Sequence, residues 1–289
     1  EAPWGFGVAT VEEGLRLRRA GVTISVIVFS PVSPDSYDPA VAQDLTLTVS
    51  DLDSVERVAA AATRTGHTGR FHVEIDTGMG RSGFDWRRVA EWGPDLVDRA
   101  SPASIWEGCY THFHSADLED DGPTRAQWES FNSVLKRLEP EKGSLIHSCN
   151  AAAAMRYPTF AADAVRPGIF LYGGCVGKGV APPEEAARVR ARVTLIRDVP
   201  ESTTLGYGAT YCSSGNERWA TLGIGYGDGF PRVLGNRGNA LLAGQKFPII
   251  GRISMDMTVV DITGAGGVEV GDAATLIGTD GDGVITLDE

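Results

Sequence analysis

Strand and helix patterns alternate from residue 1 to about residue 175, and this alternation constrains the fold more than any other feature of the chain. Short apolar segments separated by stretches of helical spacing are typical of strands that alternate with helices. Such units build a parallel sheet covered by helices on its outside. The predicted strands are residues 5–10, 24–29, 45–49, 71–76, 105–113, 145–149 and 169–172.

The seven strands predict an α/β fold, a (β/α)8 TIM-type barrel whose first strand is missing from this chain. A closed barrel of this type has eight strands, so seven would leave two strand edges unpaired. We expect the missing unit to precede residue 1, and we expect the chain to be truncated at both ends.

Helix starts between these strands carry local signals. Thr10 with Glu13 forms a capping box before a helix over 11–19, and Gly21 ends that helix. Ser50 with Asp53 is expected to open the next amphipathic helix. Further helices are predicted around residues 86–98 and along a stripe of apolar residues at 128–138.

The pattern changes at a glycine- and proline-rich segment, residues 173–183. Short apolar segments punctuated by Gly and Asp follow, at 191–199, 219–224, 240–242, 248–250, 257–262 and 274–277, which predicts a mostly-β domain. A chain of 289 residues is long enough for two domains. We therefore predict an incomplete barrel domain over 1–175, a linker over 176–184 and an incomplete C-terminal β domain over 185–289.

Composition argues against several classes of partner. A net charge of -12 without clusters of Lys or Arg disfavours nucleic acid, which is bound through basic contacts to phosphate. No apolar run is long enough for a membrane span, so no membrane partner is expected. The four cysteines lack a CxxC pair, which fits a reducing compartment, and we expect a cytoplasmic protein.

Polar residues mark the carboxyl ends of the predicted barrel strands, where active sites of such barrels lie. Arg81 follows one strand in a turn with Gly78, Gly80 and Gly83, and this turn suits an anion or a cofactor. The other candidates are His112, His114, His147–Asn150 and Arg166.

His112 and His114 leave alternatives open. Two residues apart on a strand, they would point to the same side and, with His147 and an Asp, could hold a divalent metal as in barrel metallohydrolases. One imidazole could instead lie flat beside an aromatic cofactor, or be a structural histidine bonded to backbone.

Glycine-flanked residues in the second domain form a further set of candidates. Tyr207 lies between two glycines, and a tyrosine can act as a general base if nearby cations lower its pKa. The segments 224–232 and 250–256 each join an apolar strand to a glycine and then to a charged or aromatic residue.

Seven segments, taken in order, resemble the alanine racemase family, whose members are fold-type III pyridoxal-phosphate enzymes. They are DTGMGR at 76–81, THF at 111–113, HSCN at 147–150, VRPGI at 165–169, GYGATY at 206–211, IGYGDG at 224–229 and GRISMD at 251–256. The resemblance implies racemisation of a small amino acid, with L-alanine to D-alanine for peptidoglycan precursors as the family default. It also implies pyridoxal 5'-phosphate as cofactor and a homodimer with shared active sites.

The resemblance assigns catalytic and cofactor-binding roles. Tyr207 matches a tyrosine base that serves the neighbouring subunit's site, and Arg166 matches the arginine on the cofactor's ring nitrogen. His112 would lie beside the ring and bond Tyr207 or Arg166. Gly168 and Ile169 would offer backbone amides to the phosphate.

Other matching residues are expected to bind or support. Arg81 would contact the substrate carboxylate and the cofactor, and Met255 would lend its amide to the same carboxylate. Asn150 is expected among the cofactor-binding residues. The residues expected to line the path to the site are Asp117, Tyr226, Arg232 and Arg252, and the expected supporting residues are Glu74 and Asp256.

This chain departs from the family at three places. The family's second base and cofactor anchor, a lysine near the amino end, is absent, and the four lysines present are poor substitutes. Ala151 stands where the family usually has a phosphate-binding serine. Glu74 stands where many relatives carry a carbamylated lysine, and we expect its carboxylate to supply the same negative charge behind Arg81.

The functional alternatives are therefore a barrel metallohydrolase that uses His112 and His114, and a catalytically inactive racemase fragment. Because the lysine is missing, we expect the chain alone not to racemise. Alanine cannot be distinguished by sequence from serine or from a broader range of small amino acids.

Overall fold

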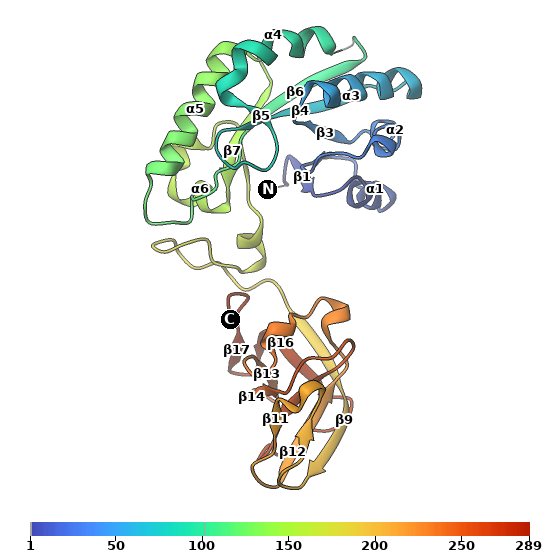
Figure 1. The fold of residues 1–289 in the computed structure, drawn as a ribbon, viewed down its shortest axis with the longest axis vertical. Helices are drawn as coiled ribbons and strands as arrows, with labels where there is room; N and C mark the ends of the chain where they lie inside the picture. The colour runs from blue at the N-terminus through green and yellow to red at the C-terminus, as the bar shows by residue number, and fades with distance from the viewer. Residues whose placement is uncertain (1, 101) are drawn as a thin grey trace. The chain divides into compact units, whose positions relative to one another are not determined.

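The computed structural model describes residues 2–100 and 102–289, which divide into two compact units (Figure 1). The first unit comprises the chain up to Gly168 together with Val176–Val180. The second comprises Ile169–Cys175 and Ala181–Glu289. The chain thus changes unit within the glycine-rich stretch that follows the last barrel strand.

The first unit is built on a parallel sheet in the order β1-β2-β3-β4-β6-β7-β8, with β5 paired to β4. The seven strands of this path confirm the predicted number and the TIM-type barrel architecture. Among the described residues β1 and β8 do not pair with each other. The strands are β1 (Gly5–Val8), β2 (Ser25–Val28), β3 (Thr46–Val49), β4 (Gly69–Asp76), β5 (Phe84–Asp85), β6 (Ser104–Tyr110), β7 (Leu145–Asn150) and β8 (Ala164–Arg166).

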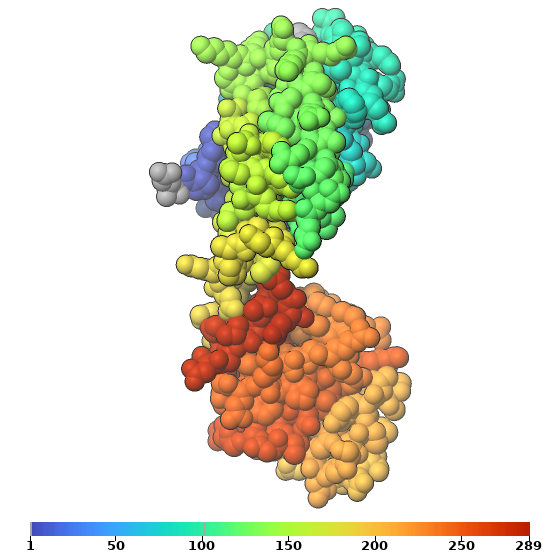
Figure 2. Space-filling model, turned by 90° about the vertical axis from the view of Figure 1, so that its left-hand side faces the viewer, coloured from blue at the N-terminus to red at the C-terminus, as the bar shows by residue number. Residues whose placement is uncertain are grey.

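Helices follow the strands and cover the outer face of this sheet. They are α1 (Val11–Arg19), α2 (Tyr37–Ala42), α3 (Leu52–Thr65), α4 (Val89–Arg99), α5 (Gly122–Leu138) and α6 (Ala151–Arg156). Phe131 and Val134 of α5 are fully buried, and they belong to the same apolar cluster as Phe71 and Val73 of β4. The opposite face of α5 forms the green surface in Figure 2.

Helix starts follow the predicted chemistry with one shift. Thr10 and Glu13 form the predicted capping box of α1, and Gly21 follows that helix in a left-handed conformation with φ of 86°. The prediction that Ser50 opens α3 is wrong, because Asp51 is its N-cap. The carboxylate of Asp51 accepts the amide N–H of Ser54 at 2.6 Å, which leaves the Ser50 side chain for another partner.

Two of the predicted strands differ in the structure. Residues 169–172 form a 3-10 helix (η4, Ile169–Tyr172), and the last strand is Ala164–Arg166 instead. Ile169 and Tyr172 are 55% and 62% exposed, so these residues lack the burial of an inner strand. The strand predicted to reach residue 113 ends at Tyr110, so His112 and His114 lie in a loop.

The side chains of β4 separate into two different faces. Phe71, Val73 and Ile75 join the apolar cluster under the helices, as strand alternation requires. His72 and Glu74 lie on the other face and are only 0% and 4% exposed. The interior of this barrel is therefore lined in part by buried polar groups, whereas apolar layers are usual for such barrels.

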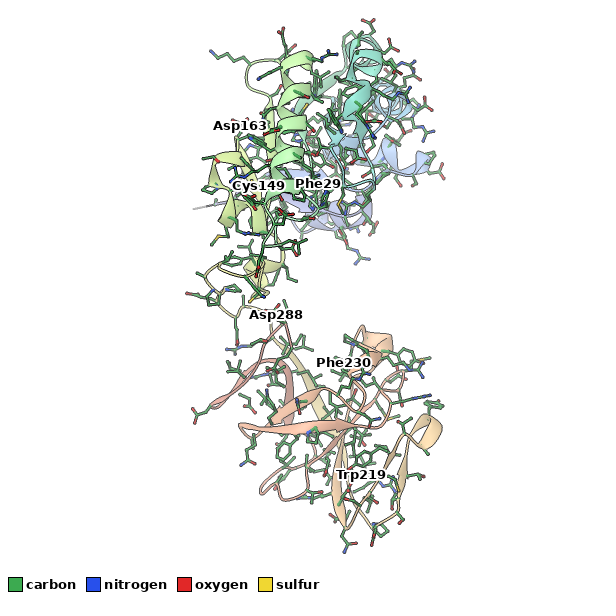
Figure 3. All side chains as sticks on the ribbon, turned by 60° about the vertical axis from the view of Figure 1, so that its left-hand side comes forward. Phe29, Cys149, Asp163, Trp219, Phe230 and Asp288 are labelled. Carbon is green, nitrogen blue, oxygen red and sulfur yellow. The ribbon has the colours of Figure 1, made fainter. Side chains whose placement is uncertain are left out.

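The second unit is a small antiparallel barrel, which confirms the mostly-β prediction. Six strands pair in a ring, β13-β14-β15-β12-β9-β16, closed by the pairing of Leu241 with Thr275. The strands are β9 (Val189–Val199), β12 (Glu217–Leu222), β13 (Asn239–Leu242), β14 (Gln245–Ile250), β15 (Thr258–Asp261) and β16 (Ala273–Asp280), with β17 (Gly283–Ile285) beside β16. Trp219 and Phe230, labelled in Figure 3, are both buried in this unit.

A hairpin of β10 (Thr204–Leu205) and β11 (Tyr211–Cys212) projects from this barrel. Between its strands lies a short 3-10 turn, η5 (Tyr207–Ala209), flanked and interrupted by Gly206 and Gly208 at φ of 66° and 75°. Positive φ is accessible to glycine without strain, so the two glycines allow Tyr207 to sit at the tip of the hairpin.

Candidate active site

Arg166 is the centre of the polar residues at the carboxyl edge of the parallel sheet. Its Nη1 lies 2.7 Å from Nδ1 of His147, and its Nη2 donates to the backbone oxygens of Thr111 and Ser148 at 2.8 and 3.1 Å. The guanidinium also stacks over the ring of Tyr110 at 5.1 Å. These contacts hold the guanidinium in one orientation at the end of β8.

Electrostatics at Arg166 follow from its burial. Removal from water lowers the pKa of Arg166 to about 10, and the negative charge of Glu74 partly offsets that effect. Arg166 therefore remains a cation at neutral pH. Burial, and then the charge of Arg166, lowers the pKa of His147 well below its ordinary value, so this imidazole is neutral.

His112 lies beside Arg166, and its Nδ1 is 3.4 Å from Nη2 of the arginine. Burial lowers the pKa of His112 to about 4, with a further contribution from the charges of Arg166 and Arg81. His114, by contrast, is exposed and bonds to Ser115 through Nδ1 at 2.6 Å. The structure thus brings His112, but not His114, to the arginine.

The metal-site alternative is not supported. Within residues 2–100 and 102–289, no group of three or more His, Cys, Asp or Glu side chains is arranged to hold a metal ion. The expectation that His112 and His114 share one strand face fails because both residues follow the end of β6. Gln127 of α5 instead holds this loop, accepting from the His114 amide at 3.1 Å and donating to the His112 carbonyl at 3.0 Å.

The glycine-rich turn after β4 is held by one carboxylate. Oδ1 of Asp76 accepts the amide N–H groups of Gly78 and Gly80 at 2.9 and 3.0 Å. Gly80 has φ of 69°, a conformation that favours glycine. The turn presents Arg81 as an exposed side chain, close enough to His112 to lower the pKa of that imidazole.

Glu74 lies behind this turn in the barrel interior. Its Oε2 accepts the hydroxyl of Ser50 at 3.1 Å, and in the part of the chain that the structure describes it forms no ion pair with Arg81. Burial, and then the negative charge of Glu74, raises the pKa of Tyr110. The carboxylate thus acts electrostatically on the Tyr110 and Arg166 pair.

Asn150 ends β7 and caps α6. Its Oδ1 accepts the Ala153 amide at 3.0 Å, and its Nδ2 donates to the Phe113 carbonyl at 3.1 Å. Ala151, the first residue of α6, is buried. Gly168 has open space where a side chain would begin, so its backbone is accessible to a ligand.

Asp117 lies farther along the loop that follows β6. Its side chain is exposed, and a side chain at Gly177 would begin 2.5 Å from the Asp117 carbonyl. This close approach leaves no room for a side chain at residue 177.

The predicted residues of the second unit gather on one face of that unit. Tyr207 is 68% exposed at the hairpin tip, and a Cβ at the adjacent Gly208 would lie 3.3 Å from the guanidinium of Arg252. The amides of Tyr226 and Gly227 donate to the carbonyls of Ser254 and Met255 at 3.0 and 2.8 Å.

Other side chains complete this face. The guanidinium of Arg232 lies 5.7 Å from the ring centre of Tyr226, and Met255 is 55% exposed. Asp256 follows directly, with its carboxylate 3.7 Å from the Cβ position of Gly227. The segments that contain Tyr226 and Met255, predicted separately, therefore pack against each other.

Several residues that contact the side chains around Arg166 were not among the predicted site residues. His72 bonds His147, Thr48 bonds Tyr110, and Glu107 lies 3.7 Å from His72. The available signal was strand alternation, since polar residues at every second position of a buried strand face the same side as Glu74.

Family models match nearly the whole chain. The model described as alanine racemase, N-terminal domain, matches residues 2–176, and the model described as alanine racemase, C-terminal domain, matches residues 186–289. Alanine racemase 2 of Caldanaerobacter subterraneus subsp. tengcongensis is 37% identical over 290 residues, covering 98% of this chain and 74% of the relative. Alanine racemase of Desulforamulus reducens is 37% identical over 287 residues, covering 94% of this chain and 75% of the relative.

Solved structures show the same architecture. Alanine racemase of Clostridium difficile 630 superposes with a TM-score of 0.87 and 29% identity, over 98% of this chain and 74% of that one. Alanine racemase from Bartonella henselae with covalently bound pyridoxal phosphate superposes with a TM-score of 0.79 and 26% identity, over 95% of this chain and 76% of that one. The order of the strands, the two units and the sequence matches agree, and the chain belongs to the alanine racemase family.

Proposed function

We propose that this protein racemises a small amino acid, converting L-alanine to D-alanine, with pyridoxal 5'-phosphate as cofactor. The observation that carries the proposal is the partly buried Arg166, which His147 and two backbone carbonyls hold at the carboxyl edge of the sheet. An arginine fixed in this way is a permanently charged donor for a ring nitrogen. D-Alanine made by this reaction would serve peptidoglycan precursors.

The residues present fit one side of the cofactor. Arg166 would donate a hydrogen bond to the ring nitrogen. Because the guanidinium stays protonated at neutral pH, protonation of the neighbouring ring nitrogen is disfavoured. The neutral His112 would lie beside the ring. The cofactor, when bound, supplies the electron sink that acidifies the Cα proton of the amino acid.

Binding of the phosphate would depend on backbone groups. Gly168 leaves room for a close approach, and its amide and that of Ile169 would donate to the phosphate. Asn150 fixes the start of α6 at this edge. Ala151 lacks the hydroxyl of the family's usual serine, so we expect phosphate binding weaker by about 0.5–1.5 kcal/mol, the size of one hydrogen bond.

Two groups would act on the substrate. Tyr207 would take or give the Cα proton, because its hydroxyl is exposed at a hairpin tip and is available to a site in a neighbouring subunit. Arg81 and the amide of Met255 would bind the carboxylate, with Asp117, Tyr226, Arg232 and Arg252 along the path to it. Glu74, and Asp256 next to Met255, would support these residues.

The second base of the family is a lysine, and the four lysines of this chain lie elsewhere. Lys178 pairs with Glu119 and Lys246 pairs with Glu289, while Lys136 and Lys142 lie on α5 and just after it. We therefore propose that the second base is not among these 289 residues. The chain by itself should bind the cofactor without a covalent bond and should not racemise.

A homodimer with shared active sites is part of the proposal. The second unit exposes apolar side chains, Tyr207, Val233, Met255 and Met257 among them, which are available to a second copy of the chain. In the described part of the chain no helix is long and apolar enough to cross a membrane. The four cysteines are free, which fits the proposed location in the cytoplasm.

The test compares the full product of the gene that encodes this chain with the 289-residue chain alone. With pyridoxal phosphate, the full product should convert L-alanine to D-alanine, measured with D-amino acid oxidase, whereas the chain alone should not. L-Serine tested in parallel sets the substrate range. Tyr207→Phe should lower kcat by at least about 100-fold without loss of fold, since a general base contributes about 10²–10⁴-fold. Activity retained in that variant would remove Tyr207 from the mechanism.

Cofactor binding and dimerisation have separate readouts. Reduction with borohydride followed by mass spectrometry should leave the 289-residue chain without added cofactor mass, because no lysine lies at the site. Attachment to any of the four lysines would contradict the assignment of the second base. Light scattering at several protein concentrations should give the mass of two chains, and a monomer throughout would contradict the shared site.

A further inference from the structure

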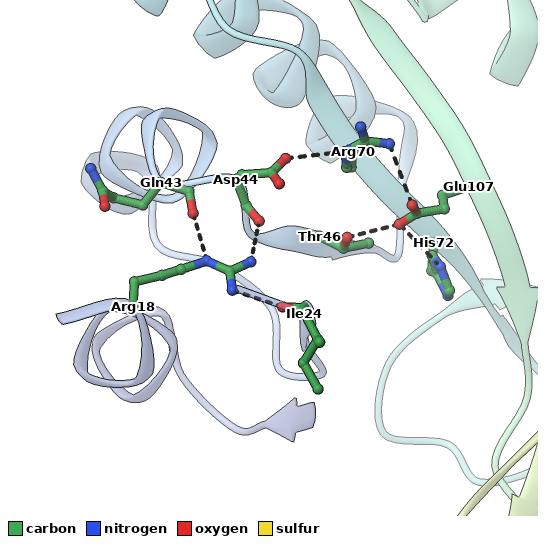
Figure 4. Close-up of polar contacts among 8 residues, drawn as sticks. All are labelled: Arg18, Ile24, Gln43, Asp44, Thr46, Arg70, His72 and Glu107. Carbon is green, nitrogen blue, oxygen red and sulfur yellow. Dashed lines mark hydrogen bonds and ion pairs between the residues drawn. The ribbon is translucent and has the colours of Figure 1, made fainter. Parts of the chain in front are cut away.

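A line of hydrogen-bonding side chains crosses the interior of the first unit and ends on Arg166. Nδ1 of His72 lies 2.8 Å from Nε2 of His147, whose Nδ1 lies 2.7 Å from Nη1 of Arg166. At the far end, Nε2 of His72 faces the carboxylate of Glu107 at 3.7 Å (Figure 4). The three groups behind Arg166 come from β4, β6 and β7.

The arginine at one end and Glu107 at the other together favour one protonation state of the two histidines. A guanidinium has donors and no acceptor, so Nδ1 of His147 must accept. A neutral imidazole then carries its proton on Nε2, which donates to Nδ1 of His72. His72 in turn must carry its proton on Nε2, directed at Glu107. Every donor in the line therefore points from Arg166 toward the carboxylate.

Other arrangements place two donors against each other, or leave Nε2 of His72 without a proton beside the carboxylate of Glu107. A proton on Nδ1 of His147, which is buried, would face the Nη1 donor of the partly buried Arg166 at 2.7 Å. A proton on both nitrogens of the buried His147 would add a positive charge next to the Arg166 cation, which is unfavourable in a low dielectric. Both rings, at 0% and 1% exposure, are too buried for water to compensate.

Glu107 is the last residue of the line, at the end far from Arg166. Its Oε2 accepts the hydroxyl of Thr46 at 2.8 Å, and its Oε1 pairs with Arg70 at 3.4 Å. These contacts hold the carboxylate beside His72, whose Nε2 has no hydrogen-bond partner among the described residues. The electrostatic attraction at 3.7 Å favours the Nε2 proton over the alternative tautomer.

We propose that Glu107 and His72 are positioning residues for Arg166: they fix the tautomer of His147, so that the guanidinium always meets an acceptor. The relevance to the reaction rests on the proposed function, in which Arg166 binds the ring nitrogen. The tautomers themselves do not depend on that function.

The first experiment measures the tautomers directly. Long-range proton–nitrogen NMR spectra of protein labelled with ¹⁵N-histidine, at about pH 7, distinguish a proton on Nε2 from one on Nδ1. Removing the five histidines one at a time assigns the signals. We expect His72 and His147 both to be neutral with the proton on Nε2. A proton on Nδ1 of either ring overturns the proposal, whether or not the protein racemises.

Variants of Glu107 test whether its carboxylate sets the tautomers of His72 and His147. Glu107→Leu removes the acceptor and should give a mixture of tautomers at His72, while Glu107→Gln keeps an oxygen and should preserve the wild-type pattern. Glu141→Leu changes an exposed glutamate outside the line and serves as the matched control. Unchanged spectra in a folded Glu107→Leu variant would overturn the role of Glu107.

Kinetics separate positioning from a merely structural role. In the active protein, Glu107→Leu should lower kcat per folded molecule by about tenfold with little change in KM, the lower end of effects for groups that orient a functional side chain from behind. Glu107→Gln should retain most of the wild-type kcat. A loss of folded protein with unchanged kcat in the remainder would show that Glu107 only stabilises the fold, and would overturn the positioning role.

Discussion

Replacement of Glu217 by glutamine should destabilise the second unit by about 2–4 kcal/mol at neutral pH. The carboxylate is buried and accepts three hydrogen bonds. Oε2 accepts from the Tyr211 hydroxyl at 3.0 Å and from Nε1 of Trp219 at 2.7 Å, while Oε1 accepts from the Ser214 amide at 2.9 Å. These bonds join the hairpin that carries Tyr207 to strand β12.

The magnitude follows from the donors that glutamine cannot satisfy. All three partners donate, and a carboxamide has only one oxygen, so its NH2 group must face at least one donor. An unsatisfied buried donor costs about 1–3 kcal/mol, and the bonds that remain lose the strength they gain from a charged acceptor. Glu201→Gln, on an exposed turn of the same unit, is the control and should change stability by less than about 0.5 kcal/mol.

The difference should depend on pH in a defined direction. Burial alone would raise the pKa of Glu217, but the bonds from Trp219, Ser214 and Tyr211 outweigh it and hold the pKa below 4.5. A carboxyl with a lowered pKa in the folded state stabilises the protein above its unfolded pKa, and this stabilisation is lost as the pH falls through the folded value. The difference in unfolding free energy between wild type and Glu217→Gln should therefore become smaller as the pH falls below about 4.5.

Trp219 gives the assay, because it is the only one of the six tryptophans within residues 181–289 of the sequence. Urea unfolding of fluorotryptophan-labelled protein, followed by the fluorine NMR signal of position 219, reports on this unit. A difference in unfolding free energy between wild type and Glu217→Gln below about 1 kcal/mol at neutral pH would refute the reasoning. A difference that does not change with pH would refute it as well.

The remaining predictions concern three other sites. Glu74→Gln should lower kcat/KM by about tenfold in the active protein, because it removes a buried negative charge beside Arg166 and Tyr110; unchanged kinetics would refute the supporting role of Glu74. Two of the four thiols, the exposed Cys175 and Cys212, should react with a thiol reagent in the folded protein, and all four should react in denaturant. Phe131→Ala should lower the unfolding free energy by about 3–5 kcal/mol, measured by urea titration.

Much of the architecture could be predicted because it depends on local patterns. The capping box at Thr10 and Glu13 requires only residues three apart, and the apolar alternation of Phe71, Val73 and Ile75 identifies a strand by itself. Failures lie where tertiary context decides. Residues 169–172 are apolar enough for a strand, but they follow Pro167 and Gly168 and form a 3-10 helix with exposed side chains.

Candidate residues could be found by position, whereas their partners could not. The carboxyl ends of parallel strands meet at one edge, so Arg81, His112 and Arg166 were all expected there. The bond between His72 and His147 joins residues 75 positions apart, and nothing local specifies it. The expectation that Glu74 lies behind Arg81 rested on the place where relatives carry a carbamylated lysine, and the structure instead gives Glu74 a partner at another strand end, Ser50.

A partly buried arginine at the end of β8 explains why polar residues occupy the interior of this barrel. Arg166 cannot be neutralised at physiological pH, so each of its bonded N–H groups needs an acceptor that does not itself become positive. Backbone carbonyls meet this requirement, but a histidine does so only if its proton is held on the far nitrogen. One such histidine needs a second acceptor behind it, and the same requirement then applies to His72 and ends only at a carboxylate. The polar positions of β4, β6 and β7 are thus a consequence of placing a permanent cation at the end of β8.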